Sequence, residues 1–132
     1  MKSGYHSVYN IKFHLVLVTK YRNKCLNKQI IDELNLIFTD TCDKWEVSLL
    51  EFGAEQDHVH LLIDFNPTIQ PSKFVNNLKT VSSRLVRKKF QSHLSQFYWK
   101  PVLWSRSYCL VSTGGAPLEV IKKYIENQNS PK

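Results

Sequence analysis

The sequence predicts an α+β fold in which an antiparallel sheet carries two helices on one face. Three observations lead to this prediction. Apolar and polar residues alternate in short segments, as in strands, and longer segments have the 3.6-residue period of amphipathic helices. Glycine and proline residues separate these segments. The chain has 132 residues, of which 42% are hydrophobic, and this composition suits a single domain spanning residues 1–132.

The predicted elements follow the order β-α-β-β-α-β-α. Four strands are expected, at residues 8–19, 47–52, 58–65 and 102–112, the last most clearly from residue 108. Three helices are expected, at residues 28–44, 71–90 and 117–128, with a turn at 53–57 and a flexible joint at 113–116. Asn27 can cap the first helix, and Pro71 and Pro117 suit the first turns of the other two.

The first six elements match the split arrangement of ferredoxin-like and RRM-like domains. This topology places both long helices on one face of the sheet. It leaves the other face free for a ligand and makes the last helix an addition. Residues 15–18 are apolar without interruption, which is typical of a strand that is buried on both faces.

The charged residues are segregated along the chain, whose formal net charge is +7. Residues 32–64 hold most of the acids, whereas residues 65–118 contain basic residues and no acid. Such segregation indicates a surface that meets a polyanion, although a solvated basic face without a partner is the alternative. Aromatic residues that could stack unpaired bases are interleaved with the charge: Phe97, Tyr98, Trp99, Trp104 and Tyr108.

Several classes of protein are not indicated. No apolar run reaches the roughly 20 residues needed to span a bilayer, and no secretory signal is recognisable. We therefore expect no membrane partner and a cytoplasmic location in a bacterium or archaeon. The three cysteines are widely spaced, so a disulfide framework is not expected. No phosphate-binding glycine loop is present, and we expect no nucleotide cofactor.

Two histidines form the most informative motif. In a strand over residues 58–65, His58 and His60 would project from the same face and could hold one metal ion. Glu55 and Asp57 are alternative oxygen ligands. A pair of histidines is otherwise commonly structural. His14 could reach the same sheet face, although a core role suits it better, and His6 and His93 are expected at the surface.

A second motif lies near the C-terminus. In a helix over residues 117–128, Tyr124 and Gln128 are one turn apart on the same side. An unperturbed phenol has a pKa of about 10, so a nucleophilic Tyr124 would need help, and Lys122 and Lys123 could supply positive charge. A tyrosine in a helix commonly just packs its ring. Together with the histidines, however, these residues are the parts of a site that cuts phosphodiesters.

With these motifs in view, the chain resembles the single-tyrosine HUH transposases of small bacterial and archaeal insertion sequences, which mobilise single-stranded DNA. The resemblance extends from about residue 8 to residue 128. The matching segments are Phe13-His14-Leu15-Val16, Thr19-Lys20-Tyr21-Arg22, Asp57-His58-Val59-His60-Leu61-Leu62, Leu103-Trp104, Ser107-Tyr108-Cys109, Thr113-Gly114-Gly115 and Tyr124-Ile125-Glu126-Asn127-Gln128.

The resemblance implies roles for these residues. His58 and His60 would be metal ligands, with Gln128 as the third, and the metal would be Mg²⁺ or Mn²⁺. Tyr124 on the C-terminal helix would be the nucleophile that forms a 5′-phosphotyrosine link with DNA. The family works as a homodimer in which the tyrosine helix of one subunit completes the site of the other.

The resemblance also implies a DNA partner with hairpins at the ends of the element. Charge alone places this contact on six basic residues together with the N-terminal bases: Lys73, Arg84, Arg87, Lys88, Lys122 and Lys123. Two alternatives remain open. The chain could be a domesticated relative that acts on genomic hairpin repeats, or a non-catalytic module that binds single strands and whose histidines are structural.

Overall fold

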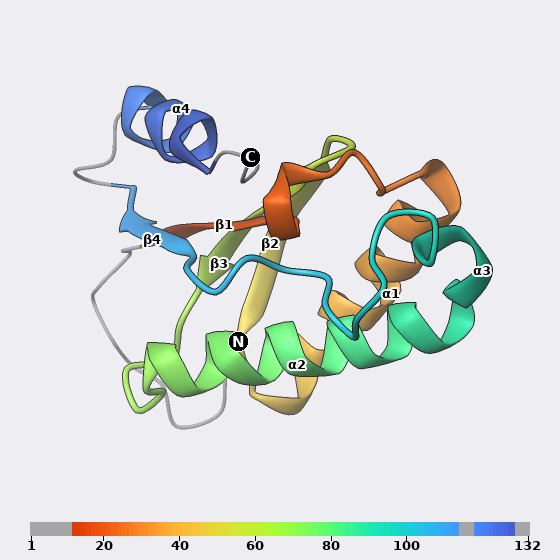
Figure 1. Ribbon diagram of the computed structural model, residues 1–132. Coiled ribbons are helices and arrows are strands. Elements are labelled where there is room, and N and C mark those ends of the chain that lie inside the picture. The colour runs from red at the N-terminus through yellow and green to blue at the C-terminus, as the bar shows by residue number, and fades with distance from the viewer. Residues whose placement is uncertain (1–11, 114–117, 129–132) are drawn as a thin grey trace.

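The computed structural model describes residues 12–113 and 118–128. These residues form a four-stranded antiparallel sheet with the strand order β2-β3-β1-β4, as Figure 1 shows. The strands are β1 (Phe13–Val18), β2 (Ser48–Ala54), β3 (His58–Asp64) and β4 (Cys109–Ser112). The predicted α+β class and the split ferredoxin-like order of strands are therefore confirmed.

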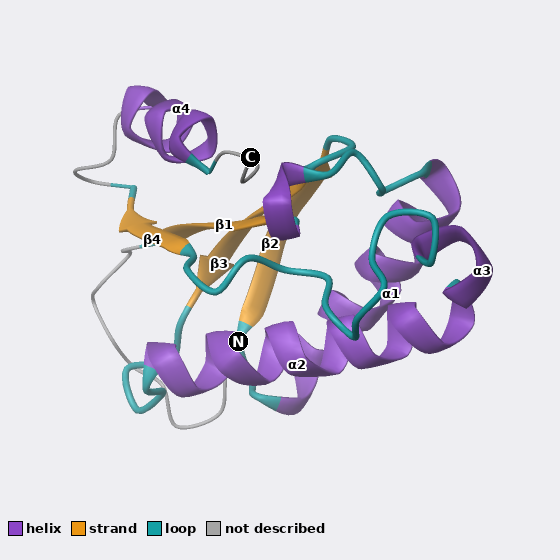
Figure 2. Ribbon diagram, in the orientation of Figure 1, coloured by secondary structure: helices purple, strands orange, loops and turns teal. Residues whose placement is uncertain are grey.

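The long helices α1 (Lys28–Lys44) and α2 (Pro71–Lys89) cover one face of the sheet, as is clear in Figure 2. Both start with the signals expected from the sequence. The Asn27 side chain accepts a hydrogen bond from the Ile30 backbone N–H at 2.9 Å, which caps α1. Pro71 occupies the first turn of α2, where its missing N–H costs no hydrogen bond.

The main core lies between these helices and the two central strands. In β3, the side chains of Val59, Leu61 and Ile63 are fully buried and alternate with half-buried ones. They belong to one apolar cluster with Phe38 of α1 and Phe74 of α2. The alternation arises because successive strand side chains point to opposite faces. The histidine-bearing face of β3 is thus turned away from α1 and α2.

Helix α4 (Leu118–Asn127) covers part of the opposite face. Ile121 is buried in a second apolar cluster with Val16, Val18 and Cys109, and Tyr124 packs against that cluster. The expectation that this face is free is therefore wrong over β1 and β4. The uninterrupted apolar run at residues 15–18 has this cause, because β1 is buried on both faces.

Several predicted boundaries differ from the observed ones. Strand β1 starts at Phe13 rather than at residue 8, and residues 8–11 lie outside the described part of the chain. Strand β2 continues to Ala54, so the turn before β3 is shorter than predicted. The short helices Lys20–Arg22 and Gln91–Leu94 (α3) are additional to the prediction. Most of the predicted flexible joint, residues 114–116, also lies outside the described residues.

The segment 102–108 is a loop rather than the first part of the last strand. It meets the end of β1 through an isolated bridge between Trp104 and Thr19 and a hydrogen bond from the Ser105 backbone N–H to the Val18 carbonyl at 2.7 Å. The buried Trp104 indole donates a hydrogen bond to the Ser82 hydroxyl of α2 at 2.9 Å. This contact holds the segment against the helix layer, so pairing along β1 starts only at Cys109.

No helix in residues 12–113 or 118–128 combines the length and apolar character needed to cross a membrane.

Two leucines of α1 provide a matched test of this core. Leu34 is fully buried, whereas Leu36 is 68% exposed. Leu34→Ala should lower the free energy of unfolding by about 2–5 kcal/mol, because it leaves a cavity. Leu36→Ala should change it by less than about 0.5 kcal/mol. Urea unfolding followed by circular dichroism measures both, and equal losses would contradict the assigned face of α1.

Candidate active site

The two histidines of the motif lie side by side on one face of β3. His58 and His60 are both half-buried, and the buried Val59 between them faces the helices. Across the sheet, His58 pairs with Val18 and His60 pairs with Val16. The predicted common face is confirmed. Since Val16 and Val18 belong to the cluster against which Tyr124 packs, the α4 tyrosine and the histidines share this side of the sheet.

Asp57 orients His58. Its Oδ1 lies 2.9 Å from His58 Nδ1, and its Oδ2 accepts a hydrogen bond from Arg22 Nε at 3.0 Å. Burial favours a higher pKa for the Asp57 carboxyl, but the hydrogen bonds from His58 and Arg22 outweigh burial and lower the pKa. An ionised carboxylate then holds the proton on His58 Nδ1 and leaves Nε2 free to bind a ligand. Glu55 is exposed in the turn before β3.

His60 contacts a third histidine. His14 Nδ1 lies 2.7 Å from His60 Nε2, and the two rings stack with their centroids 4.8 Å apart. One of these nitrogens must donate and the other accept, so both rings cannot be cationic in this contact. Burial lowers the pKa of His60, and the charge of a protonated His14 lowers it further. His14 does reach the face of the histidine pair, and it is hydrogen-bonded there.

Tyr124 and Gln128 meet at one serine. Ser107 Oγ lies 2.9 Å from the Tyr124 hydroxyl and donates a hydrogen bond to Gln128 Oε1 at 3.3 Å. This confirms that Tyr124 and Gln128 lie on the same side of the C-terminal segment, although α4 itself ends at Asn127. A serine hydroxyl has one proton, so when Ser107 donates to Gln128 it accepts from Tyr124.

The Tyr124 hydroxyl is not poised as a phenolate. Burial raises its pKa, and the hydrogen bond with Ser107 offsets this only in part. Lys122 and Lys123 are exposed and are not among the groups that shift this pKa. The expected cationic help from these lysines is therefore not found.

Lys79 of α2 fixes the loop that carries Ser107. Its Nζ donates hydrogen bonds to the carbonyl oxygens of Ser105 and Arg106, both at 2.7 Å. Burial lowers the pKa of this ammonium, and the nearby Lys20 contributes in the same direction. The contacts of Ser107 and Lys79 join segments that no local sequence pattern relates, so neither contact is predictable from the sequence.

The predicted basic surface does not form one patch with Tyr124. Lys73, Arg84, Arg87 and Lys88 all belong to α2, which covers the sheet face opposite α4. Lys122 and Lys123 lie on α4.

His93 is only partly at the surface. It is half-buried, and its Nε2 donates a hydrogen bond to the Cys25 carbonyl at 2.8 Å. His6 lies outside the described residues.

The donor set suits a divalent ion. Imidazole nitrogens bind first-row transition metals, and an amide oxygen suits Mg²⁺ and Mn²⁺. The Asp57–His58 contact has the form in which a carboxylate backs a metal-binding imidazole. Among the described residues, no group of three or more His, Cys, Asp or Glu side chains could hold an ion. A third protein ligand from the described residues would have to be of another type, such as Gln128.

Comparison with known proteins assigns the chain to a family. The model of the IS200-like transposases matches residues 7–128. The chain is 32% identical over 129 residues to the ISDra2 transposase TnpA of Deinococcus radiodurans, covering 98% of this chain and 91% of that protein. It is 31% identical to the transposase for insertion sequence element IS200 of Salmonella typhimurium, with coverage of 96% and 82%. The chain therefore belongs to the IS200-like transposase family and is a DNA transposase by descent.

Solved structures agree with this assignment. A crystal structure of a candidate transposase from Deinococcus radiodurans R1 superposes with a TM-score of 0.87 at 34% identity, covering 99% of this chain and 100% of that one. A REP-associated tyrosine transposase bound to a REP hairpin superposes with a TM-score of 0.50 at 10% identity, covering 95% and 69%. The second likeness concerns the fold alone.

The burial of His60, together with its contact with His14, makes the metal-free protein sensitive to acid. Because the pKa of His60 is lowered, the folded state binds fewer protons than the unfolded state. The free energy of unfolding is then highest above the ordinary histidine pKa of about 6.5 and falls as the pH drops below it. Urea titrations in EDTA should show this loss, and His14→Gln should reduce it. A stability that does not fall with acid would contradict the shift.

Proposed function

We propose that this transposase cleaves and rejoins single-stranded DNA at insertion-sequence ends through a 5′-phosphotyrosine intermediate on Tyr124. The observation that carries the proposal is the contact of the Tyr124 hydroxyl with Ser107, which also bonds the Gln128 amide. Tyr124 packs on the sheet face that bears His58 and His60. A nucleophile and candidate metal donors thus share one surface.

We propose that His58, His60 and Gln128 hold a Mg²⁺ or Mn²⁺ ion. Such an ion polarises a phosphate and stabilises the negative charge that develops on its oxygens. Asp57 keeps His58 in the tautomer that leaves Nε2 free. His14 contacts His60 Nε2 and so leaves Nδ1 of His60 as the nitrogen open to a metal. Burial, followed by the charge of a protonated His14, favours the neutral form of His60, which is the form that binds metals.

Tyr124 attacks phosphorus in this proposal. The bond from its oxygen to phosphorus forms, the bond from phosphorus to the 3′-oxygen breaks, and the phenol proton ends on the released 3′-hydroxyl. The exchange conserves a phosphodiester, so rejoining is the reverse reaction and needs no external energy source. Ser107 orients the Tyr124 hydroxyl, and the raised pKa of Tyr124 means that its proton leaves as the new bond forms.

The proposed partner is single-stranded DNA with hairpins at the element ends. The solved REP-associated relative is bound to a REP hairpin, and the exposed basic residues Lys73, Arg84 and Lys88 of α2 offer phosphates a second surface, away from Tyr124. We propose that the reaction takes place in the bacterial or archaeal cytoplasm. A domesticated relative acting on genomic repeats would use the same chemistry, so the genomic neighbourhood separates the two.

Covalent capture tests the proposed chemistry. Labelled single-stranded DNA carrying the hairpin of the chain's own element is mixed with the protein and Mg²⁺ or Mn²⁺, and adducts are resolved on a denaturing gel. We expect an adduct with the unchanged protein and none with Tyr124→Phe or with His58→Ala. EDTA should also remove it, because the phosphate would lose its electrophilic assistance.

Tyr108→Phe is the matched control. It removes one phenol hydroxyl from the residue next to Ser107 and keeps the ring that packs in the main core. Its adduct yield should stay close to that of the unchanged protein. An adduct that persists in Tyr124→Phe would contradict the assignment of Tyr124 as the nucleophile. DNA binding without any adduct would favour the non-catalytic module.

We further propose that the protein acts as a homodimer with shared active sites. Mixing Tyr124→Phe subunits with His58→Ala subunits tests this. If the tyrosine of one subunit serves the histidines of the other, each mixed dimer has one complete site, and activity should return to about a quarter of the unchanged level. If each site uses its own tyrosine, as the Ser107–Tyr124 contact within one chain permits, the mixture should stay inactive.

A further inference from the structure

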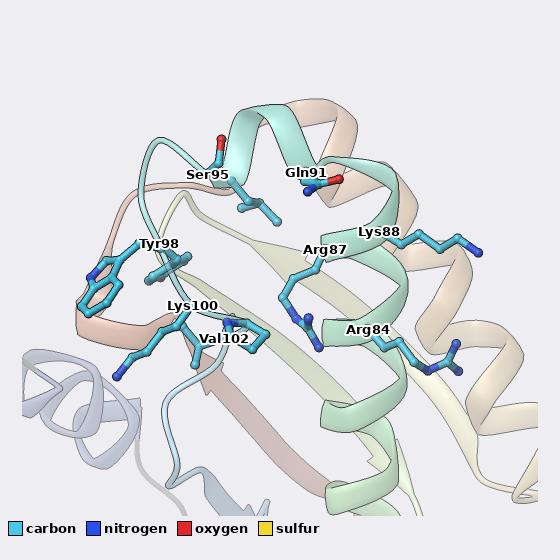
Figure 3. A pocket seen from close by; sticks show the side chains of 11 residues that line it. Arg84, Arg87, Lys88, Gln91, Ser95, Tyr98, Lys100 and Val102 are labelled. Carbon is cyan, nitrogen blue, oxygen red and sulfur yellow. The ribbon is translucent and has the colours of Figure 1, made fainter.

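A pocket of about 660 Å³ opens where the end of α2 meets α3 and the loop that follows it. Figure 3 shows it from close by. Four cationic side chains line it, namely Arg84, Arg87, Lys88 and Lys100, and its described lining contains no acidic side chain. No described residue of α4 lines this pocket, so it is separate from the surface that bears Tyr124.

The positive charge of the pocket is not neutralised within the described part of the chain. None of the ion pairs there involves the four cationic side chains of the lining. The neighbouring Lys89, in contrast, pairs with Glu33 of α1 at 2.9 Å. Arg87 points from α2 toward the loop that carries Lys100. Uncompensated cations around a hollow attract an anion and hold it there.

Trp99 adds an aromatic face to this charge. Its side chain is 93% exposed, whereas Trp104 is 7% exposed and Trp45 is half-buried. A single exposed apolar residue is ordinary, but this one lines a cationic pocket. An indole stacks on the face of an unpaired base while cations hold the flanking phosphates. Bases inside a duplex have both faces covered, so they cannot use such a site.

The wall that carries Trp99 is fixed in place. The hydroxyl of the adjacent Tyr98 donates a hydrogen bond to the Lys20 carbonyl at 2.6 Å. His93 Nε2 donates to the Cys25 carbonyl at 2.8 Å, and the Asn23 amide donates to the Phe97 carbonyl at 3.4 Å. These bonds tie the wall to the segment after β1. A fixed wall lowers the ordering cost of binding a ligand.

We propose that this pocket binds an unpaired nucleotide of single-stranded DNA, with the base stacked on Trp99 and the flanking phosphates held by Arg87 and Lys100. Gln91 and Ser95 also line the pocket and can hydrogen-bond a base edge. The site is a second DNA contact, remote from cleavage. The proposal rests on the proposed DNA substrate but requires no chemistry at Tyr124.

Stacking of the base on Trp99 is tested with two labelled probes. One is an oligothymidylate of about six nucleotides, a length within the range of single-strand sites. The other is an abasic phosphodiester of equal length. Fluorescence anisotropy of the full chain gives both affinities. Trp99→Ala should weaken oligothymidylate binding roughly 5- to 150-fold, as expected for one lost stack. Trp99→Phe should restore most of the affinity, and the abasic probe should bind weakly to all three proteins.

The role of the cationic side chains is tested against Lys89, which lies on α2 as Arg87 does. Arg87→Gln and Lys100→Gln should each reduce the slope of log affinity against log salt by about 0.7, because each loses one phosphate contact on a single strand. Lys89→Gln removes the same charge from a side chain turned to Glu33 and should leave affinity unchanged. Leu36→Ala, at another exposed apolar position, controls for lost apolar surface.

Two results would contradict the proposed binding of a nucleotide in this pocket. One is equal oligothymidylate affinity for Trp99→Ala and the unchanged protein, with circular dichroism showing both folded. The other is equal loss in Lys89→Gln and Arg87→Gln, which indicates diffuse charge rather than a site. Covalent capture on the same preparations separates the two proposals. If binding depends on Trp99 but no adduct forms, only the proposed cleavage by Tyr124 is refuted. If an adduct forms but binding does not depend on Trp99, only the proposed nucleotide pocket is refuted.

Discussion

The packing of α4 against the sheet is the contact on which the candidate site depends. Ile121 is buried with Val16, Val18 and Cys109, and this apolar contact places the Tyr124 hydroxyl at Ser107. A helix of ten residues is too short to be stable by itself in water. Its structure therefore requires the sheet surface beneath it, and the surface bearing the histidines becomes a site only when α4 is docked.

Burial and hydrogen bonds set the protonation states that the candidate site favours. Asp57 stays ionised through His58 and Arg22, His60 favours its neutral form, and Tyr124 retains its proton through burial. Neutral imidazoles and an ionised carboxylate behind one of them favour metal binding. A protonated, partly buried phenol does not attack by itself. The proposed reaction therefore needs positive charge from outside this chain, which a bound metal ion would supply.

Local patterns predicted the two motifs of the candidate site but not the loop that contacts them. The common face of His58 and His60 follows from the strand period, which is a property of a few adjacent residues. The apolar run at residues 15–18 indicates that β1 is buried on both faces, whereas the order of the elements predicts that one sheet face is free. The structure agrees with the apolar run, because α4 packs on that face over β1. Ser107 and Lys79 were unpredictable because their contacts span 17 and 26 residues and depend on how a loop packs.

Paramagnetic broadening by Mn²⁺ tests most directly whether α4 and β3 build one site. In NMR spectra of the full chain, added Mn²⁺ should broaden the imidazole signals of His58 and His60 and the side-chain amide of Gln128. Signals from Leu36 on α1, which packs on the opposite sheet face, should stay sharp, and His58→Ala should reduce all of the broadening. Broadened histidines with an unaffected Gln128 would contradict a site assembled by the docking of α4.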